Sequence, residues 1–116
     1  MVIVLAEYWV SHIEQEEKHI TKVNAFLNTI EGLKNPNIFS KNEVIKSIDE
    51  NDDKWYTCML KEKDSGKRIW EKGSEIHIVD KDGKKFIRTN PDEIGEDNLG
   101  TLPPIDQISD KSFLNV

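Results

Sequence analysis

The sequence predicts an α+β domain, with a single antiparallel sheet of about five strands and one short helix on one face, in the order ββαβββ. Two observations lead to this class. Stretches rich in β-branched and aromatic residues recur along the chain between short polar turns, and only one stretch carries a helical apolar stripe. We assign residues 1–105 to this domain and residues 106–116 to a C-terminal tail.

The first two expected strands form an antiparallel hairpin. Residues 2–13 are rich in β-branched and aromatic types, and their length allows a bulge within one long strand. Residues 14–18 are a polar turn, and residues 19–28 then alternate. This alternation predicts that Ile20 and Val23 lie on opposite faces.

The helix follows a connection over residues 29–39. Ser40 and Glu43 have the spacing of a capping box, and Phe39 can pack against Val44 as a hydrophobic staple. A short apolar stripe continues from Val44. A helix of about three turns is marginal alone, so we expect it to lie on the sheet.

Three further strands are expected after the helix. They cover residues 53–60, residues 68–80 and residues 85–89. The second of these is interrupted at Gly73 and Ser74, which predicts a bulge or a second turn. An Asp-Gly pair between the second and third strands is typical of a tight hairpin turn.

The segment after the last strand is irregular. Pro91 has no N–H for a sheet ladder and favours an extended Asn90, so the strand should end there. Apolar residues then recur in a polar loop, and we expect them to fold back over an open edge of the sheet. A binding loop is the alternative, because long loops are often functional. The apolar residues are Ile94, Leu99, Leu102 and Ile105.

Two motifs in this region carry a resemblance. The stretches FIRTNPD, residues 86–92, and EDNLGTLP, residues 96–103, resemble the end of the bacterial domain-of-unknown-function family DUF3892. The family's Ile-Thr-x-Val strand and short helix resemble residues 20–23 and residues 43–50.

The resemblance covers about residues 5–104, and the chain departs from the family's compact form by a longer middle, especially residues 53–78. It implies a small bacterial or phage-borne α+β domain. It implies no known activity and therefore lends no catalytic residues.

The net charge of −6 is concentrated at the end of the chain. Residues after Arg88 carry a net charge of −5, so the preceding part is close to neutral. Attraction to nucleic acid or to an anionic membrane is therefore not expected, whereas a basic partner is allowed. Solubility is the simpler explanation. The charged residues after Arg88 are Asp92, Glu93, Glu96, Asp97, Asp106, Asp110 and Lys111.

The expected location is the cytoplasm. A single cysteine, Cys58, allows no intramolecular disulfide and points to a reducing compartment. The apolar N-terminus lacks preceding basic residues and is broken at Glu7, which favours a strand over a signal peptide or membrane helix.

Candidate catalytic groups are few, so we lean against an enzyme. Cys58 could pair with His12 or His77, but a mid-strand cysteine is more typically a small buried hydrophobe. Carboxylate clusters could bind a hard cation, yet the DKDGKK stretch lacks the spacing of a calcium loop. We expect no metal and no cofactor.

Binding residues are expected at the end of the last strand. The Arg88 guanidinium can clamp Asp97 or backbone carbonyls of the following loop. Alternatively, Arg88, Thr89 and Asn98 form a site for an anion or carboxylate. The acids Asp92, Glu93, Glu96 and Asp97 are the other candidate binding residues.

The leading functional hypothesis is a non-catalytic module that binds another protein through a sheet face or edge. Its aromatic residues are interpreted mainly as sheet core rather than as a stacking surface for nucleic acid. One alternative is an acidic inhibitor that occupies the basic groove of a nucleic-acid enzyme. Another is a small metal-dependent hydrolase or nuclease that uses His12, His77 and nearby carboxylates. A homodimer through the face without the helix is also expected to be possible.

Overall fold

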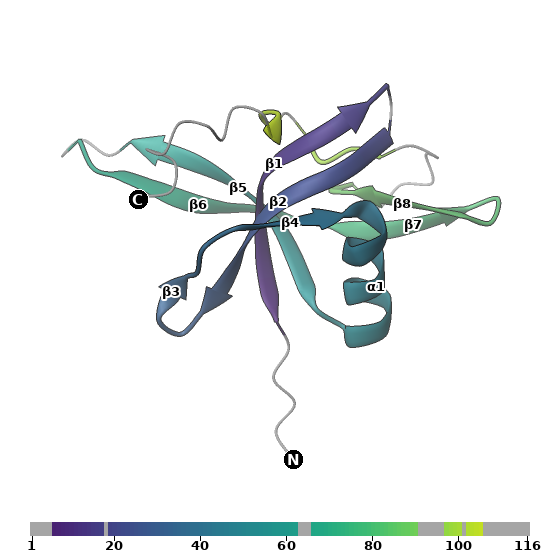
Figure 1. The fold of residues 1–116 in the computed structure, drawn as a ribbon, viewed down its shortest axis with the longest axis horizontal. Helices are drawn as coiled ribbons and strands as arrows, with labels where there is room; N and C mark the ends of the chain where they lie inside the picture. Colours follow the sequence, from purple (N-terminus) through teal and green to yellow (C-terminus); the bar gives the residue numbers. More distant parts are fainter. Residues whose placement is uncertain (1–5, 18, 63–65, 91–96, 101, 106–116) are drawn as a thin grey trace, which may run out of the picture.

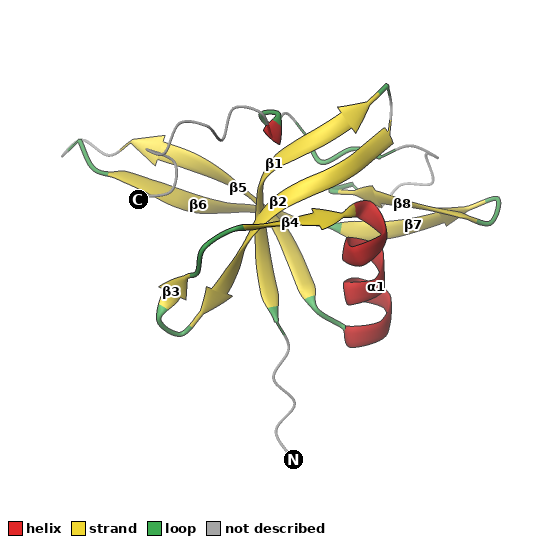
Figure 2. Cartoon of the chain, viewed as in Figure 1, coloured by secondary structure: helices red, strands yellow, loops and turns green. Residues whose placement is uncertain are grey.

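The computed structural model describes residues 6–17, 19–62, 66–90, 97–100 and 102–105. They form one helix and eight strands, arranged as Figures 1 and 2 show. The elements in chain order are β1 (Glu7–Glu16), β2 (His19–Thr29), β3 (Gly32–Leu33), β4 (Asn37–Ser40), α1 (Lys41–Asn51), β5 (Lys54–Glu62), β6 (Arg68–Glu75), β7 (His77–Lys81) and β8 (Lys84–Arg88).

The α+β class is confirmed, but the prediction of a single antiparallel sheet is wrong. The main sheet has the order β3-β2-β1-β5-β6, with β4 also paired to β2. Its central pair, β1 and β5, is parallel from Glu7–Lys54 to Val10–Thr57. Strands β7 and β8 form a separate antiparallel sheet. The element order ββαβββ omits the short strands β3 and β4 and takes β6 and β7, which belong to different sheets, as one strand.

The parallel pair follows from β4, whose first three residues lie in the stretch expected to be a connection. β4 pairs antiparallel with β2 and so runs in the same direction as β1. The following helix carries the chain back to the end where β1 begins. There Lys54 N–H donates to the Ala6 carbonyl at 2.9 Å, and β5 starts alongside β1 in the same direction.

Two bulges in the β1–β2 hairpin change which side chains enter the core. Val10 pairs with Ala25 and His12 with Asn24, so Ser11 is an extra residue on β1. This bulge, which the length of the strand had suggested, keeps both Val10 and Ile13 in the core. On β2, Thr21 is extra because Glu14 pairs with Lys22 and Gln15 with Ile20.

The second bulge overturns one sequence prediction. Simple alternation placed Ile20 and Val23 on opposite faces, whereas both belong to the same core cluster. The extra residue reverses the alternation between them.

The helix begins and ends as its sequence predicts. Ser40 Oγ accepts from Glu43 N–H at 3.1 Å, and the Glu43 carboxylate accepts from Ser40 N–H at 2.9 Å, which confirms the capping box. Val44 is fully buried against the main sheet, and Phe39 packs on the same cluster. In the described part of the chain, no helix is long and apolar enough to cross a membrane.

The interruption expected at Gly73 and Ser74 is a bulge within β6. Thr57 of β5 lies opposite both Gly73 and Ser74 of β6, and its hydroxyl accepts from Ser74 N–H at 3.1 Å. A methyl group on Gly73 would overlap the Thr57 hydroxyl and lie 3.1 Å from the Thr57 carbonyl oxygen. Glycine is therefore required here by close packing.

The β7–β8 hairpin turns at Asp82 and Gly83, with φ values of 54° and 76°. Positive φ at both central residues is the type I′ turn that an Asp-Gly pair predicts. The hairpin contributes Ile87 to the main core.

The described residues of the segment after β8 cover edges of both sheets, as the sequence analysis predicted. Asn98 N–H donates to the Ile87 carbonyl, and Thr89 N–H donates to the Asn98 carbonyl, which extends the small sheet. Farther along, the Pro103 carbonyl accepts from Ile13 N–H at 3.0 Å on β1. Leu99 is buried in the core. Ile94 and residues 106–116 lie outside the described residues.

Asp97 is the anchor of this segment. Its side chain is fully buried, and its two oxygens accept from Ile20 N–H at 2.9 Å and from Ile87 N–H at 3.0 Å. Lys41, the first residue of α1, donates to the same carboxylate at 2.8 Å. One side chain thus joins β2 of the main sheet, β8 of the small sheet and the start of the helix.

Replacing Asp97→Asn should lower the free energy of unfolding by about 3–5 kcal/mol, the usual effect of breaking a buried ion pair. The amide has only one oxygen for the two backbone donors and leaves Lys41 without its charge partner. Urea unfolding followed by circular dichroism measures the change. Asp49→Asn is the matched control, because Asp49 pairs with Lys85 at the surface and its loss should change little. Equal effects of the two substitutions would contradict this role for Asp97.

Replacing Gly73→Ala should destabilise the chain by about 1–3 kcal/mol through overpacking. The added methyl group clashes with the Thr57 hydroxyl, so the double variant with Thr57→Ala should lose less stability than the two single variants together. A double-mutant cycle in urea measures this coupling. Strict additivity would show that the close contact is not the cause.

Candidate functional site

The face of the main sheet opposite the α1 core carries a row of aromatic side chains. Trp9 of β1 pairs with Phe26 of β2 on one side and with Tyr56 of β5 on the other. Directly paired residues point to the same face of a sheet, so these three rings form a row across three strands. Trp70 of β6 joins it through a ring contact with Phe26 at 5.0 Å between centroids. We call this surface the aromatic face.

A polar network holds part of the aromatic face in place. Glu7 Oε2 accepts from Trp9 Nε1 at 2.9 Å and from Asn28 Nδ2 at 2.7 Å. Lys72 Nζ donates to the other oxygen of Glu7 at 3.3 Å and lies 3.8 Å from the centroid of the Tyr56 ring. Trp9, Tyr56 and Trp70 remain half-buried, so part of each ring is accessible, and the network holds Trp9 and contacts the Tyr56 ring.

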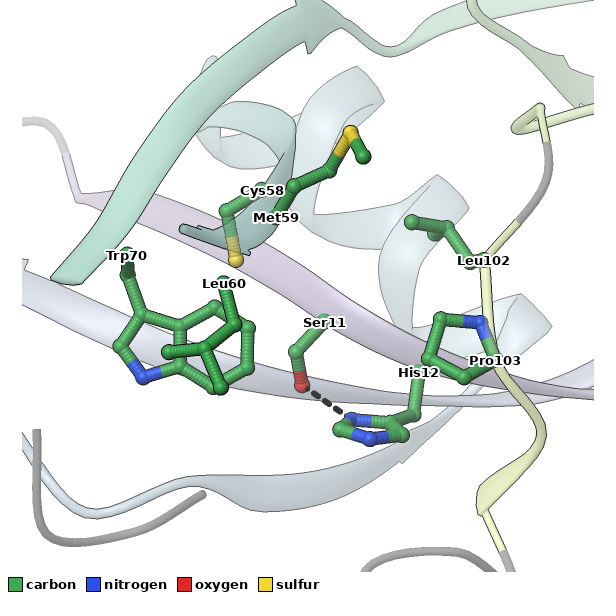
Figure 3. A pocket seen from close by; sticks show the side chains of 8 residues that line it. All are labelled: Ser11, His12, Cys58, Met59, Leu60, Trp70, Leu102 and Pro103. Carbon is green, nitrogen blue, oxygen red and sulfur yellow. Dashed lines mark hydrogen bonds between the residues drawn. The ribbon is translucent and has the colours of Figure 1, made fainter. Parts of the chain in front are cut away.

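A pocket of about 220 Å³ lies between β1 and β5, next to Trp70. The two strands pair only as far as Val10 and Thr57, and the bulge at Ser11 comes directly afterwards. The pocket occupies the space beyond this point, and we call it the fork pocket. Figure 3 shows its lining residues, which are Ser11, His12, Cys58, Met59, Leu60, Trp70, Leu102 and Pro103.

His12 and Ser11 form the polar part of the fork pocket. Ser11 Oγ donates to the Asn24 carbonyl at 3.4 Å, accepts from Asn24 Nδ2 at 3.0 Å and lies 2.7 Å from His12 Nδ1. Burial lowers the pKa of His12 and favours its neutral form.

Cys58 also lines the fork pocket but is a poor nucleophile. The residue is 1% exposed, and burial raises the pKa of its thiol to about 12. The thiolate is the reactive form of cysteine, and it is scarce at neutral pH with such a pKa. The structure therefore favours Cys58 as a small buried hydrophobe.

The residues predicted at the end of the last strand meet at the junction of β8 with the following segment. Arg88 is buried, and its Nε donates to the Asn90 carbonyl at 3.2 Å, one form of the expected clamp on backbone carbonyls. Thr89 and Asn98 are joined by the backbone hydrogen bond described above. The Asn98 side chain accepts from Gly100 N–H at 2.9 Å, as in an Asx turn. Their role in binding an anion stays a prediction.

Of the four acids in the inhibitor hypothesis, the structure describes Asp97. Asp97 is buried and engaged by Lys41 and two backbone N–H groups, so its carboxylate is not presented to an outside partner. Asp92, Glu93 and Glu96 lie outside the described residues.

The histidines of the hydrolase hypothesis line different pockets. His12 lines the fork pocket, whereas His77 lines a pocket beside the end of α1, together with Asp52 and Glu75. Within the described ranges, no three His, Cys, Asp or Glu side chains are grouped so that they could hold a metal ion.

A protein-family model matches most of the chain. The model of a family described as a protein of unknown function, DUF3892, covers residues 8–103. The chain belongs to the DUF3892 family. No curated protein and no solved structure matched the chain.

The DUF3892 match includes the motif that carried the resemblance, and four described positions of that motif have clear structural roles. Asp97 accepts from two strands and the helix, and Leu99 fills the core. Leu102 packs against the same core, and the Pro103 carbonyl pairs with β1. In this DUF3892 chain the motif fixes the segment that forms one wall of the fork pocket.

The aromatic face was not among the predicted binding residues, although the sequence contains an indication of it. Tyr8-Trp9 and Trp55-Tyr56 are adjacent aromatic pairs on strands. Successive side chains on a strand point to opposite faces, so one member of each pair must leave the core. Tyr8 and Trp55 stack in the core at 4.2 Å, and Trp9 and Tyr56 lie on the other face.

The free energy of unfolding should fall as the pH drops below about 6.5, the pKa of an unfolded histidine, in part because of His12. The folded pKa of His12 is lowered by burial, so the unfolded chain binds a proton first. The His12 contribution should keep lowering the free energy of unfolding until the pH reaches the folded pKa of His12. Below that pH, His12 should cause no further change. His12→Gln should remove this part of the pH dependence in urea titrations, whereas the exposed His19→Gln should retain it. Identical pH profiles for wild type and His12→Gln would contradict the assignment.

The Cys58 thiol should resist alkylation in the native chain. With a pKa of about 12, only about one thiol in ten thousand is ionised at pH 8. Iodoacetamide labelling followed by mass spectrometry should be slow under native conditions and fast in urea. Rapid native labelling would mean that the thiol is activated or accessible.

Proposed function

We propose that this chain is a non-catalytic module that binds another protein through its aromatic face. The observation that carries the proposal is the row formed by Trp9, Tyr56 and Trp70, which is half-buried on a sheet face opposite the α1 core. Tryptophan and tyrosine are enriched among the residues that contribute most to protein interfaces.

The network around Glu7 supports the same proposal. Trp9 and Lys72 are both held by the Glu7 carboxylate, and Lys72 lies over the Tyr56 ring. Side chains already fixed in the free protein lose less conformational entropy when a partner binds. The arrangement therefore favours recognition over a purely structural use of these rings.

Catalysis is less favoured by the geometry. The Cys58 thiol has a pKa of about 12, and His12 and His77 line separate pockets. The acidic inhibitor remains an alternative proposal, which would depend on Asp92, Glu93 and Glu96 because Asp97 is engaged internally. We further propose that the protein is bacterial or phage-borne and cytoplasmic, with a second copy of the chain as the alternative partner.

A tagged chain should recover a stoichiometric protein partner from a lysate of its source cell, in the presence of nuclease. The double substitution Trp9→Ala and Tyr56→Ala should weaken binding at least tenfold, because truncation of interface aromatics usually costs more than about 1 kcal/mol each. Purified partner and calorimetry measure the affinity, and light scattering of the chain alone tests self-association.

Ile30→Ala is the control, since Ile30 is a fully exposed apolar residue at the β2–β3 turn. It should leave the affinity unchanged. Binding that survives the double substitution in a folded chain would contradict the aromatic face as the interface. A partner lost on nuclease treatment would indicate nucleic acid instead.

A further inference from the structure

The fork pocket lies beside the aromatic face and exists because two parallel strands separate. β1 and β5 are paired at Val10 and Thr57. After this point the Ser11 bulge redirects β1, whose Ile13 N–H bonds to the Pro103 carbonyl rather than to β5. The space between the strands is therefore closed by the C-terminal segment and not by continued pairing.

The walls of the fork pocket are largely apolar and carry no formal charge. Trp70 and Leu60 lie on one side, and Leu102 and Pro103 lie on the other, as Figure 3 shows. The His12 ring is T-shaped to the Trp70 ring, with centroids 6.4 Å apart and planes at 70°. A further ring beside this pair can make the same kind of edge-to-face or offset-stacked contact. A charged group would lose its hydration without gaining an ion pair.

The volume of the fork pocket limits its occupant to one ring. At about 220 Å³ it is smaller than the roughly 300–1,000 Å³ typical of sites for drug-sized ligands and cofactors. It is larger than the roughly 150 Å³ apolar cavity that is known to admit benzene. A single aromatic side chain is of the matching size.

We propose that the fork pocket binds one uncharged aromatic side chain of the protein partner. This inference rests on the proposed function, because it places the anchor of that interaction at one end of the aromatic face. Phe26 contacts Trp70, and Trp70 also lines the pocket, so the two surfaces are continuous. A buried aromatic anchor surrounded by a less buried aromatic surface is the usual arrangement of an interface centre.

The probe that tests the site is p-cresol, which has the ring and hydroxyl of a tyrosine side chain, with p-toluate as its charged counterpart. Titration of the full chain by ¹H–¹⁵N NMR should give saturable shifts at His12, Cys58 and Leu60, with a Kd on the order of 1 mM as expected for a small fragment. Nuclear Overhauser contacts should connect the probe methyl group with Trp70 and Leu102. p-Toluate should bind at least tenfold more weakly.

Leu60→Trp should fill the pocket and abolish p-cresol binding, whereas Ile30→Ala should leave it unchanged. The Overhauser contacts in the wild type test the site even if Leu60→Trp does not fold. Shifts centred on the groove around Leu27 and Ile30, or no saturable shifts, would overturn the proposal.

Both sets of substitutions can be tested for binding to the partner recovered in the aromatic-face experiment. This comparison distinguishes failure of the pocket proposal from failure of the proposed function. A partner that is lost with Leu60→Trp supports both. A partner that is lost with Trp9→Ala and Tyr56→Ala but retained with folded Leu60→Trp preserves the function and overturns the anchor. If p-cresol bound but no protein partner were recovered, the proposal that the bound ring belongs to a protein would be contradicted.

Discussion

The buried carboxylate of Asp97 is the interaction on which the arrangement of the structure depends. Burial removes the water that would hydrate this carboxylate, and three hydrogen-bond donors take the place of that water. The donors come from β2, β8 and the first residue of α1. A buried charge is tolerated only when such partners are present. The carboxylate therefore requires the small sheet, the main sheet and the helix to meet at one point. The same requirement fixes the start of the segment that continues to Leu99 and Pro103.

That segment connects stability with the candidate site. Leu99 enters the core, and the Pro103 carbonyl pairs with β1 at the position where β5 has separated. The fork pocket between the strands is thereby closed on one side. The Ser11 bulge has a corresponding effect within β1, since it places His12 beside the aromatic face and Ile13 in the core. The Ser11 bulge and the segment after β8 therefore both stabilise the fold and shape the proposed binding surface.

Local chemistry predicted the features that depend on a few neighbouring residues. The Ser40–Glu43 capping box, the Asp82–Gly83 turn and the strand end near Pro91 each follow from side chains close in sequence. The edge-covering role of the last segment also followed, because isolated Leu residues in a polar loop need a place to be buried. These elements, together with the family motif, were sufficient for the α+β class.

The features that were missed depend on pairing between distant residues. The four-residue β4 has too little pattern to be distinguished from a connection, and without it the parallel β1–β5 pair cannot be derived. The Thr21 bulge changes the face of Ile20 without a residue type that marks it. For the site, Arg88 was expected to clamp either Asp97 or backbone carbonyls; it bonds to the Asn90 carbonyl, and the ion pair of Asp97 is with Lys41, 56 residues away. The adjacent aromatic pairs did contain the required information, because a strand cannot place both members in one core.

Native-state hydrogen exchange of the Ile20 and Ile87 amides tests the role of Asp97 most directly, because these are the two backbone donors to its carboxylate. If one buried side chain holds both strands, the two amides should exchange with the same free energy of opening, close to that of global unfolding. The Gly100 amide, which bonds to the exposed Asn98 side chain, should exchange faster. Exchange of Ile20 and Ile87 at clearly different free energies, or of either one at the rate of Gly100, would contradict a single junction at Asp97.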